Sequence, residues 1–145
     1  MWISEPLFSR RTKNKQPFNP YVSIIISARN ESDNIINLID GLHQQKYPKN
    51  KFEIIIINDK STDNTLQKLY DKQNQINNLK IISIDKTPKG WSSKKWALNC
   101  GIQKTKGDII LQTDADCMHT KNWITKMIKP FEDENIGFVA GPSYI

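Results

Sequence analysis

The sequence predicts an α/β protein, a three-layer sandwich in which helices cover both faces of a mostly parallel sheet. Short β-branched runs that are apolar nearly throughout alternate with segments whose apolar residues recur at helical spacing, and the connections between them are short. A continuous apolar run is typical of a strand that is covered on both faces. The alternation of such runs with helices therefore predicts parallel strands joined by helical crossovers.

The strands are expected at residues 22–26, 54–57, 79–84, 109–111 and 137–140. The first helix should follow Ser32 or Asp33, which are placed to cap it, because the apolar residues after them are spaced as on one helix face. Three more helices are expected, one opening at 61–63, one after Ser92 or Ser93, and one over 123–128. With right-handed crossovers, all parallel strands end at one edge of the sheet, where ligands bind in such folds.

Charge and composition divide the chain at about residue 20. Residues 1–20 carry three prolines, no periodicity, and four basic residues against one acidic residue, which is half of the formal net charge of +6. We interpret them as a basic arm or linker, and residues 21–145 as one domain. No nucleic-acid-binding signature accompanies the arm, so no nucleic-acid partner is expected. No apolar stretch has the length of a membrane span, and the two cysteines fit a reducing compartment.

Polar residues follow three of the predicted strands. Residues 27–31 follow the first strand, Asn58 and Asp59 the second, and residues 113–116 the fourth. If these strands are parallel, all three groups lie at the same edge of the sheet. Their convergence predicts a binding site there.

The pair Asp114 and Asp116 has the chemistry of a metal site. In extended backbone, residues two apart point to the same face, so both carboxylates would lie side by side with Ala115 turned away. At about 5 Å and an effective dielectric constant of about 20, they repel by roughly 3 kcal/mol. A divalent cation such as Mg²⁺, which favours one or two carboxylates plus substrate phosphates, removes that repulsion. The alternative is a solvated acidic turn.

Other candidate residues have two interpretations each. Asp59 either bonds a nucleotide or belongs to a turn, and Ser61 and Asp63 fit capping better than ligand binding. The basic loop at 86–95 enters a helix, and its lysines and amides can hold a diphosphate, although it is not a P-loop. His43 and His119 show no metal-ligand spacing. The tryptophans at 91 and 96 either stack on a base or pack.

Together these segments resemble family 2 glycosyltransferases, inverting enzymes with the GT-A fold. The resemblance runs from about Tyr21 to the end of the sequence and rests on four motifs in the family's order and spacing, at residues 22–31, 54–65, 90–99 and 107–116. It departs where the family commonly has two acidic residues, since this chain has Asn58 before Asp59. Ser93 occupies a position that is often glycine.

The resemblance implies a role for each matched residue. Asp59 corresponds to the residue that contacts the base, usually uracil, and Lys94 to a lysine near the donor phosphates. Asp116 corresponds to the direct ligand of an Mg²⁺ or Mn²⁺ ion that bridges the diphosphate, with Asp114 nearer the ribose or sharing the metal. The residues expected to bind the nucleotide sugar, a UDP-sugar first, are Ser27, Ala28, Arg29, Glu31, Asp59, Lys94 and Asp114.

The resemblance also implies what residues 1–145 lack. The family's general base, which takes the proton of the acceptor hydroxyl, is expected beyond Ile145, so residues 21–145 would be an incomplete, donor-binding part of the domain. The acceptor is unknown, with a lipid or a polysaccharide of the cell envelope as candidates, and the expected location is cytoplasmic, at the inner face of the membrane through the basic arm. A non-catalytic nucleotide-sugar-binding module and a nucleotidyltransferase remain as alternatives.

Overall fold

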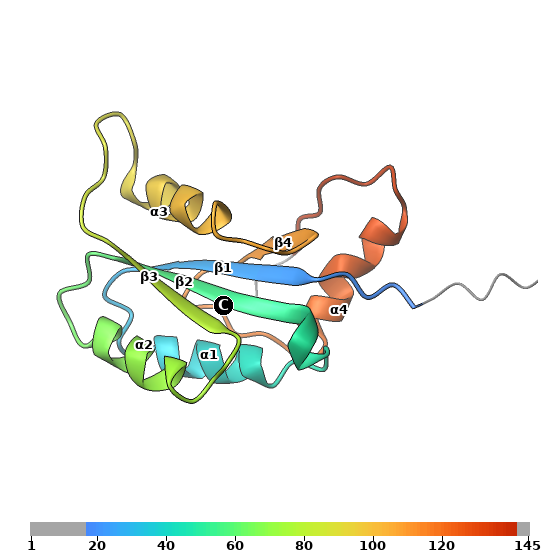
Figure 1. Ribbon diagram of the computed structural model, residues 1–145, viewed down its shortest axis with the longest axis horizontal. Coiled ribbons are helices and arrows are strands. Elements are labelled where there is room, and N and C mark those ends of the chain that lie inside the picture. Colours follow the sequence, from blue (N-terminus) through green and yellow to red (C-terminus); the bar gives the residue numbers. More distant parts are fainter. Residues whose placement is uncertain (1–16, 142–145) are drawn as a thin grey trace, which may run out of the picture.

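A computed structural model describes residues 17–141 as a four-stranded, all-parallel sheet with helices on both faces (Figure 1). The elements are β1 (Val22–Ala28), α1 (Ile35–His43), η1 (Lys49–Lys51), β2 (Phe52–Asp59), α2 (Thr65–Gln73), β3 (Leu79–Ile84), α3 (Ser93–Ile102), β4 (Ile109–Gln112), α4 (Trp123–Ile128) and η2 (Lys129–Glu132). The strand order is β3-β2-β1-β4, so the first strand lies inside the sheet and β4 lies on the far side of β1. The predicted fold class is confirmed.

The strand register brings the polar strand ends together. In β1 and β2, Val22 pairs with Phe52 and Ala28 pairs with Asn58, and on the other side of β2 Asp59 pairs with Ile84 of β3. Strand β4 pairs with the first half of β1, from Val22 to Ile25. Because β4 is short, the segment that follows it leaves the sheet beside the second half of β1.

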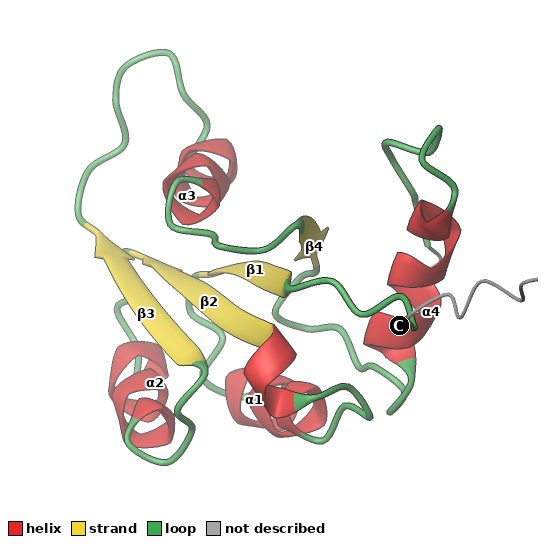
Figure 2. Cartoon of the chain, turned by 45° about the vertical axis from the view of Figure 1, so that its right-hand side comes forward, coloured by secondary structure: helices red, strands yellow, loops and turns green. Residues whose placement is uncertain are grey.

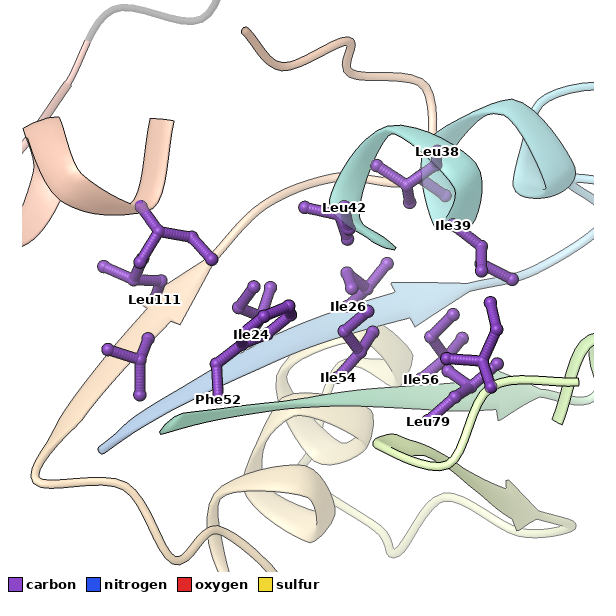
Figure 3. Packing of buried hydrophobic residues seen from close by; sticks show 14 of the residues in the cluster. Ile24, Ile26, Leu38, Ile39, Leu42, Phe52, Ile54, Ile56, Leu79 and Leu111 are labelled. Carbon is purple, nitrogen blue, oxygen red and sulfur yellow. The ribbon is translucent and has the colours of Figure 1, made fainter. Parts of the chain in front are cut away.

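The central strands alternate between two cores. On one face, Ile24 and Ile26 of β1 and Ile54 and Ile56 of β2 pack with Leu38, Ile39 and Leu42 of α1 (Figure 3). On the other face, Ile25, Ile55 and Ile57 pack against Ala97 of α3. Figure 2 shows α1 and α2 below the sheet and α3 above it. Since a central strand is covered on both sides, almost every position of β1 and β2 is buried, as the apolar runs predicted.

Three local predictions are wrong. Residues 137–140 form no strand, and Phe138 is 84% exposed. An apolar run becomes a strand only where its backbone pairs with a neighbour, and here this run lies outside the sheet. Neither Ser32 nor Asp33 caps α1, which begins after Asn34 without a side-chain cap bond, and α2 begins at Thr65 rather than at 61–63.

The start of α3 is as predicted, because Ser92 is its N-cap and the Ser92 hydroxyl oxygen accepts a hydrogen bond from the Lys95 amide (3.4 Å). Most of the predicted basic arm lies outside the described residues. In residues 17–141, every helix is too short or too polar to cross a membrane.

Candidate functional site

The loops that follow β1 and β2 are tied to each other. Asn30, whose φ of 55° is in the left-handed region, donates its amide to Ser61 Oγ (3.1 Å), and its side-chain oxygen accepts from the Thr62 amide (2.8 Å). Glu31 donates its amide to Thr65 Oγ1 (2.9 Å). These bonds hold the segment that carries Arg29 and Glu31 against the end of β2.

Asp63 is a structural link between the same two loops. Its carboxylate accepts from the hydroxyl and amide of Thr65 (2.5 and 3.0 Å) and from the Ser32 amide (3.2 Å). The hydrogen bond from the Thr65 hydroxyl, with those from the two amides, lowers the pKa of Asp63 to about 2. Its oxygens are thus engaged by the protein, as expected for a structural rather than a ligand-binding residue.

Asp59, the last residue of β2, is buried, with 3% of its surface exposed. Its Oδ1 atom has no hydrogen-bond partner, although the Lys60 ammonium lies 3.0 Å away. The two observations agree if the contact is an ion pair whose angles fall outside those of a hydrogen bond. A buried carboxylate oxygen without a hydrogen bond is costly, and the charge of Lys60 offsets part of that cost.

Lys60 connects Asp59 to the loop before α3. Its ammonium donates to Thr87 Oγ1 (2.7 Å) and Ser93 Oγ (3.0 Å), and these two hydroxyls are 3.3 Å apart. Its φ of 57° is a left-handed conformation that a side chain with a Cβ rarely adopts. Sequence reasoning assigned Lys60 only to a turn and missed this role, because both partners are 27 or more residues away.

The pair Asp114 and Asp116 follows β4 in a turn rather than in the extended backbone that was predicted. The Cys117 amide donates to the Asp114 carbonyl oxygen (3.3 Å), closing the turn. The predicted alternation of side-chain directions is nevertheless present. Ala115 is 3% exposed and belongs to the core, while both aspartates are exposed. The two carboxylates therefore lie on the solvent side, with Ala115 turned inward.

Lys94, the second residue of α3, reaches across to this turn. Its ammonium lies 2.7 Å from Asp114 Oδ1, and both side chains are about half exposed. Next to it in the loop, Trp91 is 46% exposed and packs edge-on against Trp96, with ring centroids 5.3 Å apart. The contact with Asp114 places Lys94 at the same site as the aspartate pair.

One pocket of about 340 Å³ collects most of the predicted site residues at the carboxyl edge of the sheet. It is lined by Ser27, Arg29, Glu31, Asp59, Ser93, Lys94, Asp114, Ala115 and Asp116. Of the predicted residues only Ala28 is absent from the lining, because its side chain is buried in the core on the α1 face. Ser93, which the sequence analysis named only as a possible helix start and as a departure from the family, also lines the pocket.

Two carboxylates and open space fit a hard divalent cation that brings further oxygen ligands with it. The ammonium of Lys94 already lies on one of the two carboxylates. Residues 17–141 contain no group of three or more His, Cys, Asp or Glu side chains arranged to hold a metal. A metal held by this pair would therefore need further oxygen ligands from a bound molecule.

A second cavity, of about 500 Å³, lies along β4 and touches the pocket at Asp114. Its lining is mostly apolar and includes His119, which stacks on Trp123 at 4.0 Å between ring centroids and shares a hydrogen bond with Thr113 Oγ1 (2.8 Å). Burial lowers the pKa of His119. Although this cavity is larger, the charged residues gather in the smaller pocket, which we take as the functional site.

Comparison with known proteins agrees with this geometry. The chain is 27% identical over 122 residues to glycosyltransferase AglE of Haloferax volcanii, covering 84% of the chain and 39% of that protein. It is 32% identical over 120 residues to beta-monoglucosyldiacylglycerol synthase of Nostoc sp., covering 83% of the chain and 25% of that protein. The chain thus spans well under half the length of these relatives.

Two solved structures show the same fold. The mannosyltransferase PcManGT from Pyrobaculum calidifontis, in complex with GDP-Man and Mn²⁺, matches with a TM-score of 0.73 at 24% identity, over 83% of this chain and 35% of that one. S. aureus TarS 1-349 in complex with UDP-GlcNAc matches with a TM-score of 0.65 at 29% identity, over 78% and 31%. The fold is therefore GT-A. Residues 23–145 match the family described as Glycosyl transferase family 2, and the chain belongs to that family.

Proposed function

We propose that this chain is the donor-binding part of a glycosyltransferase that binds a nucleotide-diphosphate sugar with a divalent metal and transfers a hexose-type sugar, with inversion, to an acceptor hydroxyl. The observation that carries the proposal is the pocket at the carboxyl edge of the sheet. It combines a buried carboxylate, two exposed carboxylates and a lysine. Membership in the family supports the same activity.

In this proposal the nucleotide base lies against Asp59. A carboxylate only accepts hydrogen bonds, so Asp59 would accept one from an N–H group of the base, such as those that uracil and guanine present. We place a UDP-sugar first, because TarS, at 29% identity, is solved with UDP-GlcNAc. Ser27, Arg29 and Glu31 would line the base and ribose, while Ala28 contributes backbone only, since its side chain is in the core.

The diphosphate would lie between Lys94 and the aspartate pair. Asp116 is the proposed direct ligand of Mg²⁺ or Mn²⁺, and Asp114 either shares the metal or contacts the ribose. A bound divalent metal would stabilise the negative charge that develops on the departing diphosphate. Lys94 orients the phosphates and adds a second positive charge, while Asp59 holds the base in place. Tethering both ends of the nucleotide positions the sugar for attack.

Transfer with inversion also requires a carboxylate that takes the proton of the attacking hydroxyl. We propose that polypeptide following Ile145 supplies this base together with the acceptor site. Matches that span 25% to 39% of the length of the relatives support a division of the activity between this part and a further one.

We further propose that the acceptor is a lipid or an envelope polysaccharide and that the enzyme works at the inner face of the membrane. One relative is a beta-monoglucosyldiacylglycerol synthase, whose name denotes a lipid product. The basic residues of the arm at 1–20 would supply attraction to anionic headgroups. A vesicle-binding assay with phosphatidylglycerol tests this part separately, because removal of residues 1–16 should then abolish binding.

The donor site is tested by calorimetric titration with UDP-GlcNAc, GDP-mannose and ATP, each with and without Mn²⁺. We expect metal-dependent binding of one nucleotide sugar, and its loss in Asp116→Ala. Asp85→Ala removes an exposed carboxylate just past the end of β3, outside the pocket lining, and serves as the control. Tighter binding of ATP than of either nucleotide sugar would favour a nucleotidyltransferase and overturn the proposal.

A further inference from the structure

The ion pair between Lys94 and Asp114 joins two separate elements inside the pocket. Lys94 belongs to the first turn of α3, and Asp114 to the turn after β4. Their charged atoms are 2.7 Å apart, and the side chains are 59% and 51% exposed. Ion pairs with this exposure are weak, because water and dissolved ions compete for both partners. Lys94 and Asp114 therefore form an ion pair that either residue can readily give up for another partner.

The surroundings of Asp114 explain why a cation lies there. Four carboxylates line the pocket, those of Glu31, Asp59, Asp114 and Asp116, against the cationic groups of Arg29 and Lys94. Two exposed carboxylates two residues apart repel each other, and a positive charge on one of them reduces that repulsion. Lys94 is the residue that supplies this charge to the aspartate pair.

The lysine can exchange partners without any change in the backbone. The start of α3 is held by the Ser92 cap and by the hydrogen bond from Lys60 to Ser93. The ammonium of Lys94 lies at the end of a flexible four-carbon stem, so it can move while its Cα stays in place. An exchange of partners within the pocket is thus a side-chain motion alone.

We propose that Lys94 is a placeholder for the metal: it neutralises Asp114 when no nucleotide is bound, and it transfers to the diphosphate when the metal and the nucleotide enter together. This inference rests on the proposed function and goes beyond it, because it makes Lys94 a competitor of the metal as well as a ligand of the phosphates. Since residues 17–141 offer no third metal-binding side chain at the pair, the metal alone gains little by displacing Lys94. A diphosphate both completes the metal's oxygen ligands and accepts the lysine.

The proposal predicts effects of opposite sign in one variant. Lys94→Gln removes the competing cation, so the affinity for Mn²⁺ alone should rise by about fivefold, the size expected when one exposed ion pair no longer has to be broken. The same change removes a charge-assisted hydrogen bond to the diphosphate, so the affinity for UDP in the presence of Mn²⁺ should fall by about tenfold. If Lys94 were purely structural, or if it only bound phosphate, Lys94→Gln would not raise the affinity for Mn²⁺.

Free Mn²⁺ is measured by its paramagnetic resonance signal, and UDP binding by calorimetry. Lys95→Gln makes the same change of charge at the next residue of α3, which is exposed and outside the pocket lining, and should alter neither affinity. Lys94→Arg keeps a cation at the position and should leave the affinity for Mn²⁺ alone unchanged.

If Lys94→Gln shows no gain in Mn²⁺ affinity while the natural sequence binds UDP with Mn²⁺, the placeholder role is wrong and the donor site stands. If the natural sequence binds no UDP with Mn²⁺, the proposed function fails and this inference fails with it. A rise in Mn²⁺ affinity with a fall in UDP affinity, absent from the Lys95 variant, supports the exchange.

Discussion

Strand β2 carries a buried carboxylate at each end, and the two have opposite surroundings. At the start of the strand, Glu53 is 2% exposed, and its oxygens accept hydrogen bonds from the Ser23 hydroxyl (2.7 Å), the Lys80 ammonium (2.6 Å) and the Lys106 amide (2.8 Å). At its end, Asp59 is 3% exposed and its Oδ1 lacks any hydrogen bond. Burial is thus the same, while hydrogen bonding differs.

The difference separates a structural carboxylate from the one that we propose binds a ligand. Glu53 joins β1, β2, β3 and the loop before β4. All of its hydrogen-bond donors belong to these elements, so its oxygens are engaged by the fold rather than by a ligand. Asp59 lines the pocket, and its buried Oδ1 has the Lys60 ammonium at 3.0 Å but no hydrogen bond. In a parallel sheet the carboxyl edge is where ligands bind, and Asn58 and Asp59, whose buried Oδ1 atoms both lack a hydrogen bond, lie at that edge.

The largest expected effect is a loss of stability when Glu53, at the start of β2, is replaced. Glu53→Ala leaves the Ser23 hydroxyl without its acceptor and the Lys106 amide with Ser23 Oγ (3.2 Å) alone, and should lower the free energy of unfolding by about 3 kcal/mol. Urea denaturation followed by circular dichroism measures the change. Glu134→Ala removes an exposed carboxylate and should stay within about 0.5 kcal/mol of the natural sequence. Equal losses in both variants would contradict a structural role for Glu53.

The same kind of change at the other end of β2 should affect binding instead. Asp59→Asn keeps the size of the side chain but replaces the charged acceptor, so UDP affinity should fall by about thirtyfold, which corresponds to about 2 kcal/mol for a hydrogen bond to a charged group. Unfolding should change by less than in Glu53→Ala, because Oδ1 loses only the charge of its ion pair with Lys60, whose ammonium keeps its hydrogen bonds to Thr87 and Ser93.

Calorimetry with UDP and Mn²⁺ measures the affinity, and urea denaturation measures the stability. Asp85→Asn, just past the end of the neighbouring strand β3, is the matched control and should bind UDP normally. If Asp59→Asn bound UDP as tightly as the natural sequence but was much less stable, Asp59 would be a structural carboxylate like Glu53.

The fold was predictable because strands that are buried on both faces form continuous apolar runs in the sequence. Runs such as Ile54 to Ile57 are typical of central strands in a layered α/β protein, and the strand at 79–84 has the predicted bounds. The run Gly-Phe-Val-Ala at 137–140 is also apolar but forms no strand. Whether an apolar run pairs depends on a neighbouring backbone, which composition does not encode.

The site was predictable only as far as it follows from strand order. Parallel strands were enough to bring Asp59, Asp114 and Asp116 to one pocket. The contacts of Lys60 and of Lys94 were not predictable, because lysine side chains reach partners far apart in sequence and no periodic pattern marks them. Those contacts set the electrostatics of the pocket, so the sequence located the site without describing its charge balance.

A pH titration sharpens the comparison at its structural end. Burial alone would raise the pKa of Glu53, but the hydrogen bonds from Lys80, Ser23 and the Lys106 amide, with the charge of Lys80, hold it below its usual 4.5. A carboxylate with a lowered pKa in the folded state adds stability that is present above the unfolded value and is lost as pH falls through the folded value.

We therefore expect the free energy of unfolding to decline as pH falls below about 4.5, with a shallower decline in Glu53→Gln than in the natural sequence. Parallel urea denaturations between pH 6 and pH 3 measure both slopes. Identical slopes would assign the acid sensitivity to other carboxylates.

The smallest expected effect tests whether the Lys60 ammonium holds the loop at 86–92 in place beside Asp59. Lys60→Met retains the length of the side chain but removes the ammonium that contacts Asp59, Thr87 and Ser93. The loop at 86–92 should then exchange its amide hydrogens faster, and UDP affinity should fall by about fivefold, in line with about 1 kcal/mol for ordering lost before binding.

Lys89→Met changes an exposed lysine of the same loop and is the control. Lys60→Gly separates the contacts from the backbone conformation, since glycine adopts a φ of 57° without strain. It should loosen the loop as Lys60→Met does, while gaining back some stability of the fold. If both variants at Lys60 leave loop exchange unchanged, the ammonium does not hold this loop. The contrast between the two ends of β2 would then rest on the carboxylates alone.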